Sequence, residues 1–326
     1  MIEPLLLVDS LIKYFPKRSG ILLRKTGNVH AVDGISFHIN PGETLGLVGE
    51  SGCGKSTVGK TLLRLHPATS GKVLFEGIDV MALDARQMRA LRKDMQFVFQ
   101  DPFESLNSRH TIEQILEEPL IIHKYGNDTQ RRHKVLSLLK RVGLGADAAT
   151  RYPHEFSGGQ RQRIGIARAI ALEPKFIVCD EAVSALDVSI QSQIVNLLLE
   201  LQQEMNIALL FIAHDLAVVK HISDRIAVMY LGQIVETASS EAIYNAPKHP
   251  YTKALIDAIP IPDPSIKKER TILSGDVPSA IELPKGCRFH SRCPQVQDRC
   301  LHTTPVLSAT DKTNMHQVAC HFWDSL

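Results

Sequence analysis

The sequence predicts an α/β protein with a parallel sheet, a helical subdomain inserted into it and a small irregular domain at the C-terminus. Short apolar segments alternate with turns in residues 1–100 and with helical patterns in residues 160–245, and the second alternation is typical of a parallel sheet covered by helices. In residues 101–160 apolar residues instead recur at helical spacing. Prolines and cysteines accumulate in the remainder, where regular helices and strands are disfavoured. We therefore expect domains at 1–245 and 246–326.

Apolar runs bounded by turn residues mark the individual strands. The predicted strands are Leu5–Val8, Gly34–Ile39, Thr44–Val48, Lys72–Glu76, Met95–Phe99, Phe176–Cys179, Ala208–Ala213, Ile226–Tyr230 and Gln233–Glu236. The predicted helices are Thr111–Leu120, Arg131–Val142 and Ser189–Glu204. A polar insert lies at about residues 16–30, and its basic side chains (Lys17, Arg18, Arg24, Lys25) favour a solvated loop.

Composition narrows the class of protein. The 326 residues are 22% charged and 44% hydrophobic, as in ordinary globular domains, and the net charge of +2 does not favour a nucleic-acid partner. No apolar run approaches the roughly 20 residues of a membrane-spanning helix, and Leu5–Val8 is too short for a signal-peptide core. We expect a cytoplasmic chain that depends on other subunits for any role in a membrane.

The strongest motif is a glycine-rich loop that fits G-x-x-x-x-G-K-[ST]: Gly49-Glu50-Ser51-Gly52-Cys53-Gly54-Lys55-Ser56-Thr57. It follows the Thr44–Val48 strand and precedes a helical pattern, which is the context that a phosphate-binding loop requires. Its glycines let backbone N–H groups approach phosphates closely, and the helix N-terminus favours an anion. We expect Lys55 to reach the β- and γ-phosphates of ATP and Ser56 to bind Mg²⁺. Cys53 fills a variable position of the motif.

An acidic pair, Asp180-Glu181, ends the apolar run Phe176–Cys179. Beside a phosphate loop, this pattern predicts that Asp180 binds Mg²⁺ through water and that Glu181 accepts a proton from the attacking water. Cys179 belongs to the buried strand, and we expect a structural thiol there.

Further motifs follow in a fixed order along the chain. Phe156-Ser157-Gly158-Gly159-Gln160 resembles the L-S-G-G-Q signature of ATP-binding-cassette (ABC) ATPases, with Phe in place of Leu. Other matching elements are a strand-ending Gln100, the segment Ser184-Ala185-Leu186-Asp187, the strand-ending His214, and the aromatic Phe15, with Tyr14 as the alternative. The sequence is thus similar to ABC ATPases over residues 5–245, and the fold implied is a P-loop NTPase with a helical subdomain. One position departs from the family: Ala182 stands where proline is usual, which bears on the rigidity of the loop after Glu181.

The resemblance implies roles for these residues. Ser157, Gly158 and Gly159 would cap the γ-phosphate of ATP held by a second subunit, since ABC ATPases hydrolyse ATP between two cassettes, and Gln160 would belong to the same nucleotide-binding segment. Gln100 would contact Mg²⁺ and the attacking water, and His214 would contact the γ-phosphate. Phe15 would stack on adenine.

Four further segments resemble the ATPases of oligopeptide, dipeptide and nickel importers: Val98–Phe103 with Ser105–Asn107, Phe211–Leu216, Val228–Gly232 and His249–Leu255. The insert at 16–30 resembles the second ATPase of such systems. The resemblance implies a peripheral subunit on the cytoplasmic face of the inner membrane. Its partners would be a paralogous ATPase, two membrane permeases and an extracytoplasmic peptide-binding protein, with no nucleic acid. Alternatives are the same role for nickel, an exporter ATPase, and a soluble ABC ATPase acting on DNA or ribosomes. A single phosphate loop and the absence of a long heptad run disfavour the last of these.

Four cysteines, Cys287, Cys293, Cys300 and Cys320, lie in the last 40 residues. In a cytosolic chain such a cluster favours a metal site over disulfides. The spacing lacks the C-x₂-C pair that zinc ribbons favour. The segments Gly286–His290 and Val318–His321 resemble the C-terminal segment of peptide-importer ATPases, some of which carry [4Fe-4S]. We expect a structural [4Fe-4S] cluster, with zinc or free thiols as alternatives. His290 and His321 neighbour the cysteines and could replace one ligand.

Overall fold

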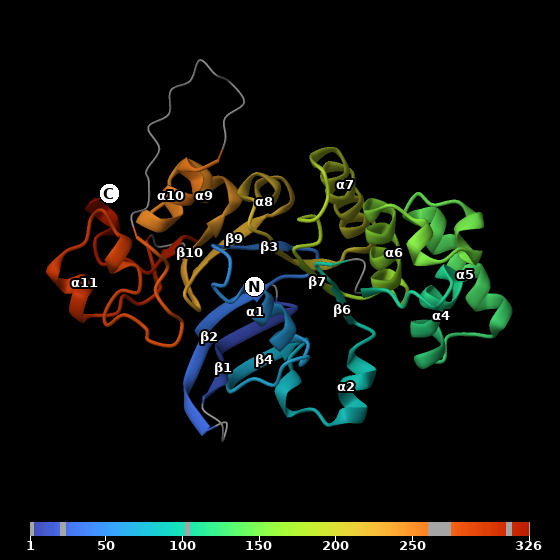
Figure 1. The fold of residues 1–326 in the computed structure, drawn as a ribbon, viewed down its shortest axis with the longest axis horizontal. Helices are drawn as coiled ribbons and strands as arrows, with labels where there is room; N and C mark the ends of the chain where they lie inside the picture. The colour runs from blue at the N-terminus through green and yellow to red at the C-terminus, as the bar shows by residue number, and fades with distance from the viewer. Residues whose placement is uncertain (1–2, 20–23, 102–104, 260–274, 311–314, 326) are drawn as a thin grey trace, which may run out of the picture. The chain divides into compact units, whose positions relative to one another are not determined.

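The computed structural model describes residues 3–19, 24–101, 105–259, 275–310 and 315–325 (Figure 1). Parts of the predicted features lie outside these ranges: Phe103, the centre of the 16–30 insert, and Pro260, Pro262 and Pro264. The chain forms two compact units. The first unit comprises residues 1–5, 39–43 and 82–212, and the second comprises 6–38, 44–81 and 213–326.

Three parallel strands form the core of the first unit: β6 (Met95–Val98), β7 (Phe176–Asp180) and β8 (Ala208–Ile212), in the order β6-β7-β8. Every residue of β7 and β8 is buried. Continuous apolar runs of this kind are typical of strands covered on both faces, and the predictions for these strands are confirmed within a residue at most ends.

The helices of this unit are α2 (Ala85–Leu91), α4 (Ile112–Ile122), α5 (Asp128–Arg141), α6 (Gly158–Ile170) and α7 (Val188–Met205). The helical subdomain is present, with α4, α5 and α6 packed together (green in Figure 1). Its last helix continues to Ile170, beyond the predicted limit at residue 160, because apolar residues of α6 pack under β6 as well as under α4 and α5.

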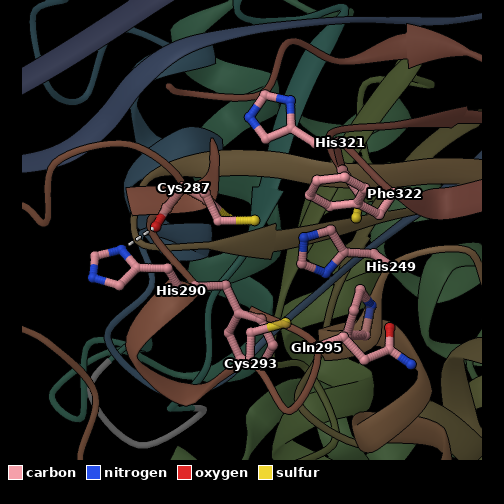
Figure 2. Close-up of a pocket in the computed structure, with 11 residues that line it drawn as sticks. His249, Cys287, His290, Cys293, Gln295, His321 and Phe322 are labelled. Atoms are coloured by element: carbon pink, nitrogen blue, oxygen red, sulfur yellow. Dashed lines mark hydrogen bonds between the residues drawn. The ribbon is translucent and has the colours of Figure 1, made fainter. Parts of the chain in front are cut away.

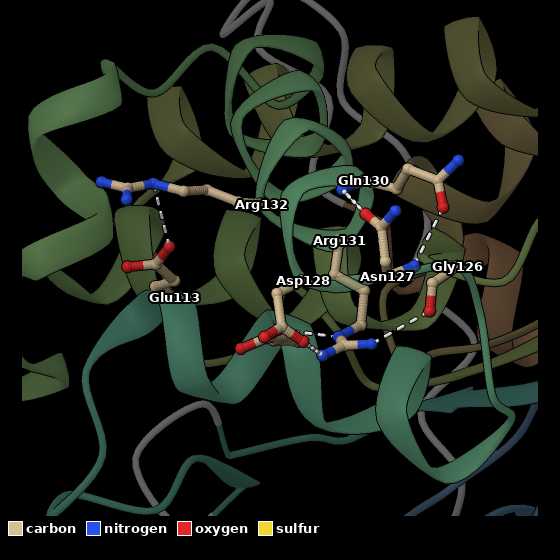
Figure 3. A network of polar contacts seen from close by, with 8 residues as sticks. Glu113, Gly126, Asn127, Asp128, Gln130, Arg131 and Arg132 are labelled. Atoms are coloured by element: carbon tan, nitrogen blue, oxygen red, sulfur yellow. Dashed lines mark hydrogen bonds and ion pairs between the residues drawn. The ribbon is translucent and has the colours of Figure 1, made fainter.

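Polar contacts fasten α4 to α5 (Figure 3). The Arg131 guanidinium donates to Glu117 at 2.8 Å and to the Gly126 carbonyl at 3.1 Å, and it also pairs with Asp128. Asn127 caps α5 by accepting the Gln130 N–H at 3.0 Å. Thr111 caps α4 in the same way by accepting the Gln114 N–H, so each helix begins at a side chain that supplies a partner for one of its first N–H groups.

The second unit contains an antiparallel sheet in the order β2-β1-β4-β5, formed by β1 (Leu6–Ser19), β2 (Arg24–Ile39), β4 (Ser70–Phe75) and β5 (Ile78–Asp79). The expectation of a solvated loop at residues 16–30 is wrong. The described part of this segment continues β1 and β2, whose backbone groups pair with each other. Lys17 is exposed, and a charged side chain that faces solvent is compatible with strand structure.

The other sheet of this unit has the order β3-β9-β10-β12-β11: β3 (Thr44–Val48), β9 (Arg225–Tyr230), β10 (Gln233–Ser239), β12 (Gln317–Val318) and β11 (Ser308–Ala309). Strand β3 is parallel to β9, and β9 and β10 form the predicted hairpin through Leu231 and Gly232. Its helices are α1 (Lys55–Leu62), α8 (Leu216–Ile222) and α9 (Ser240–Asn245).

The C-terminal residues are more regular than predicted. Helix α10 (Pro250–Asp257) begins with Pro250 at its first position, where a missing N–H costs nothing, and the His249 ring accepts the Tyr251 N–H at 3.1 Å. Helix α11 (Asp298–His302) follows, and β12 pairs with β10. No helix among the described residues has the length and apolarity to cross a membrane.

Candidate nucleotide site and cysteine cavity

The glycine-rich loop connects the fully buried strand β3 to α1 in the second unit. Gly49, Gly52 and Gly54 have φ values of 154°, 79° and 112°. A Cβ on Gly54 would lie 2.0 Å from the Ala31 carbonyl oxygen, so only glycine fits there. Gly54 precedes α1, and no side chain within the described ranges caps this helix start. Its N–H groups are therefore suited to an anionic ligand.

The Lys55 side chain is buried inside this loop. Its Nζ donates to the Gly49 carbonyl at 2.7 Å and to the Glu50 carbonyl at 3.1 Å. Ser56 and Thr57 follow at the start of α1, and Ser51 and Gly52 are exposed. The loop thus places a cation next to the N–H groups at the start of α1, an arrangement suited to phosphate groups.

Contacts from β9–β10 also fix the loop. The Gly232 N–H donates to the Cys53 carbonyl at 2.9 Å. Cys53 is buried, and burial raises the pKa of its thiol, although the nearby Lys55 opposes this shift. Cys53 therefore acts as a packing residue of the loop.

The acidic pair lies at the carboxyl end of β7 in the first unit. Asp180 is buried, and the Glu181 N–H donates to the Ile212 carbonyl at 2.9 Å. Glu181 has φ 47°, a left-handed conformation that is uncommon for residues other than glycine. Its carboxylate accepts a 2.7 Å hydrogen bond from Gln100 Nε2. Two of the three predicted catalytic residues are thus brought into direct contact.

The residues on either side of the acidic pair Asp180-Glu181 are buried or hydrogen-bonded. Burial raises the pKa of Cys179 to about 12, as the expectation of a structural thiol requires, with a further contribution from Asp180. Ala182, at the position where ABC ATPases usually have proline, is buried together with Val183. The Ser184 N–H and hydroxyl both donate to the Glu181 carbonyl, at 3.1 and 3.0 Å. The loop therefore has local restraints that do not depend on proline.

The signature segment begins helix α6. Ser157 is its N-cap and accepts the Gln160 N–H at 3.3 Å, while Gln160 accepts the Ser157 N–H at 3.0 Å. A Cβ on Gly159 would lie 2.5 Å from Ile190 Cγ2, in the first turn of α7. The glycine is therefore required by packing within the subunit, a reason that the motif alone does not reveal.

The segment Ser184–Asp187 leads into α7. Asp187 caps this helix by accepting the Ile190 N–H at 3.0 Å, and this hydrogen bond, together with that from Ser189, lowers the pKa of the exposed carboxyl. The signature helix and this segment are thus packed side by side in the first unit.

The remaining predicted residues, His214 and Phe15, lie in the second unit. His214 is exposed and directly precedes Asp215, the N-cap of α8. The Phe15 ring lies 4.6 Å from Lys13 Nζ and 5.4 Å from the His66 ring. The alternative, Tyr14, donates its hydroxyl to Asp33. Asp33 also pairs with Arg288, so the Tyr14 hydroxyl is committed to a structural network.

All four C-terminal cysteines line one cavity in the second unit, of about 370 Å³ including its part open to solvent (Figure 2). All four are free thiols, and burial raises the pKa of Cys287 to about 11. Within the described residues, no set of three or more His, Cys, Asp or Glu side chains has the geometry of a bound metal.

The histidines around the cavity contact backbone groups. His290 Nδ1 lies 2.7 Å from the Cys287 carbonyl oxygen, and His321 Nε2 lies 2.8 Å from that of Thr303. His249 accepts the Tyr251 N–H. The four sulfurs are therefore the better candidate donors of the cavity.

Two residues that contact the phosphate loop, Arg292 and Tyr251, were not predicted from the sequence. Arg292 pairs with Glu50, and the Tyr251 hydroxyl accepts the Glu50 N–H. The available signal was Glu50 itself, because an acidic residue in an anion-binding loop calls for a cationic partner.

Sequence comparison agrees with the motifs. A family model described as ABC transporter matches residues 32–184, and one described as oligopeptide/dipeptide transporter, C-terminal region, matches 235–300. The oligopeptide transport ATP-binding protein AppF of Bacillus subtilis (strain 168) is 52% identical over 324 residues, which cover 98% of each chain.

Solved structures agree as well. The ATP-binding cassette MJ0796 bound to ADP and Pi, in a dimeric post-hydrolysis state, is 29% identical with a TM-score of 0.65, covering 72% of this chain and 98% of that one. CbiO1 from Clostridium perfringens, part of the ABC transporter complex cbiONQ, is 27% identical with a TM-score of 0.65, covering 75% and 92%. The chain therefore belongs to the ABC ATPase family, in the group of oligopeptide and dipeptide transporter ATP-binding proteins.

Proposed function

We infer that this chain hydrolyses ATP to energise the import of peptides through an ABC transporter. The observation that carries the peptide assignment is the similarity to an oligopeptide transport ATP-binding protein along 98% of both chains, including the C-terminal region. The contact between Gln100 and Glu181 at the end of a buried strand supports hydrolysis, because it orients a carboxylate that can serve as general base.

Each predicted site residue has a role in this function. Lys55 and the loop N–H groups bind the β- and γ-phosphates, and Glu181 accepts the proton of the attacking water. The hydroxyl of Ser56 and the carboxylate of Asp180 are oxygen donors of the type that Mg²⁺ prefers, and Gln100 supplies an amide oxygen. The ion neutralises phosphate charge when it is bound. His214 contacts the γ-phosphate, and Phe15 stacks on adenine.

A second cassette completes the site. Ser157 and the glycines after it start α6, so their N–H groups can cap the γ-phosphate of ATP on the facing subunit. The proposed partner cassette is a paralogous ATPase. The other partners are two membrane permeases and an extracytoplasmic peptide-binding protein, which place this chain on the cytoplasmic face of the membrane.

Growth on peptides tests the function. In an auxotrophic strain that lacks this chain and every redundant peptide importer, a wild-type copy should restore growth on peptides as the sole source of the required amino acid. Lys55→Ala should fail to restore growth, while the matched control Lys60→Ala, later on the same helix, should restore it. Peptide uptake that is unchanged by deletion would contradict the proposal, and a nickel-dependent growth defect would favour nickel as the ligand.

We also propose that the C-terminal cysteines hold an iron–sulfur cluster. Four thiols line one cavity of the C-terminal region, and four thiolates are the ligand set of a [4Fe-4S] cluster. Cys287, Cys293, Cys300 and Cys320 would hold it in a structural role. Anaerobic purification should give a brown protein with about four iron per chain. Cys300→Ser should lose the iron, and Cys179→Ser, outside the cavity, should keep it. Stoichiometric zinc without iron would overturn the assignment.

A further inference from the structure

Glu50 is a carboxylate within a loop whose ligand is a polyphosphate anion. Like charges at short range repel, and this repulsion increases where solvent is excluded. An unpaired Glu50 would therefore weaken nucleotide binding, so the electrostatic partner of this side chain bears directly on the site.

That partner comes from the C-terminal region. The Arg292 guanidinium forms a two-pronged ion pair with the Glu50 carboxylate, with Nη1–Oε2 and Nη2–Oε1 distances of 2.7 and 3.0 Å. The Arg292 side chain is only 7% exposed and that of Glu50 27%. The hydrogen bonds to Glu50 raise the pKa of Arg292, so the guanidinium stays charged at any physiological pH. Such planar pairs are among the stronger charge-assisted contacts in proteins.

The backbone of Glu50 is fixed by the same region. The Tyr251 hydroxyl accepts the Glu50 N–H at 2.8 Å. The Tyr251 ring is fully buried, with ring centroids 4.8 Å from Tyr230 and 5.4 Å from Phe289. A rigid aromatic cluster therefore sets the position of the second residue of the loop.

We propose that Arg292 and Tyr251 are positioning residues of the ATP site: Arg292 neutralises Glu50, and Tyr251 fixes its backbone, so that nucleotide affinity depends on the C-terminal region. The proposal rests on the assignment of the loop as an ATP site. It deepens that assignment, because it makes a segment more than 190 residues away in sequence part of the nucleotide site.

The test measures the Kd of the full-length chain for a fluorescent ATP analogue with Mg²⁺. Arg292→Gln leaves Glu50 unpaired and should raise Kd about tenfold. Glu50→Gln removes the repelling charge and should bind as tightly as wild type or more tightly. The double variant Glu50→Gln/Arg292→Gln should recover affinity to within about threefold of wild type. A purely structural role for the ion pair would give no such recovery.

Three further variants serve as controls. Arg299→Gln makes the same charge change at an exposed position of α11 and should leave Kd unchanged. Tyr251→Phe keeps the ring, removes only the acceptor for the Glu50 N–H, and should weaken binding by a few-fold. Lys55→Ala should abolish binding, and if it does not, the assignment of the ATP site itself fails.

Two results would overturn the inference while leaving the ATP site intact. One is a wild-type Kd in both single variants, Arg292→Gln and Tyr251→Phe. The other is a double variant as weak as Arg292→Gln alone. If Arg292→Gln does not fold, as judged by circular dichroism, Glu50→Gln and Tyr251→Phe decide the question, and a weakened Glu50→Gln would contradict the charge argument.

Discussion

Gln100 Nε2 donates a 2.7 Å hydrogen bond to the Glu181 carboxylate, although the two residues are 81 positions apart in sequence. The contact arises because β6 and β7 are parallel neighbours, so the loops after both strands emerge at the same edge of the sheet. It links the residue assigned as general base to the segment that leads into the helical subdomain.

Removing this link should slow hydrolysis. Gln100→Ala deletes a hydrogen bond to a charged group, and kcat should fall by roughly 10- to 100-fold. The readout is phosphate release at saturating ATP. Gln96→Ala, within the preceding strand β6, removes an amide that donates to the Arg92 carbonyl instead, and it should keep kcat near wild type. Equal losses in both variants would contradict a specific role for Gln100.

Gly159→Ala should destabilise the chain. The added Cβ would lie 2.5 Å from Ile190 Cγ2, and overpacking of this kind costs about 1–3 kcal/mol. The control Gly165→Ala on the same helix meets no heavy atom within 4 Å and should stabilise by about 1 kcal/mol or less. Urea denaturation measures both effects. In an Ile190→Ala background the penalty of Gly159→Ala should largely disappear, and its persistence there would refute the packing argument.

Cys179 should resist alkylation in the native chain. Its side chain is fully buried, which excludes the reagent, and burial raises the pKa of the thiol, which disfavours the reactive thiolate. Iodoacetamide followed by peptide mass spectrometry should label Cys179 only after unfolding in guanidinium chloride. Rapid labelling of Cys179 in the native chain would contradict the burial of β7.

Local patterns predicted much of the fold. The runs Phe176–Cys179 and Ala208–Ala213 were recognisable because a strand buried on both faces consists almost entirely of apolar residues. The strand segments at residues 16–19 and 24–30 were missed because their basic residues resemble a solvated loop, whereas backbone pairing between β1 and β2 makes them strands. Helix α10 was missed because Pro250 was read as a helix breaker, whereas it occupies the first position of the helix.

In the candidate site, too, contiguous motifs were predictable and contacts between residues far apart in sequence were not. The phosphate loop and the acidic pair were predictable because each is contiguous in sequence and its spacing carries the chemistry. Glu50 indicates the need for a cationic partner, but the identities of Arg292 and Tyr251 were not predictable, since these contacts join residues more than 190 positions apart and depend on the packing of the C-terminal region. The steric need for Gly159 likewise depends on Ile190, which no local pattern indicates.

The most direct test of the central claim combines hydrolysis and transport in one preparation. This chain, its paralogous ATPase and the two permeases are reconstituted in liposomes with the peptide-binding protein, and ATP hydrolysis and peptide uptake are measured together. Wild type should couple peptide uptake to hydrolysis. Glu181→Gln should lower both by about 10²- to 10⁴-fold while the chain still binds ATP. Peptide uptake and hydrolysis at wild-type rates by Glu181→Gln would contradict the account.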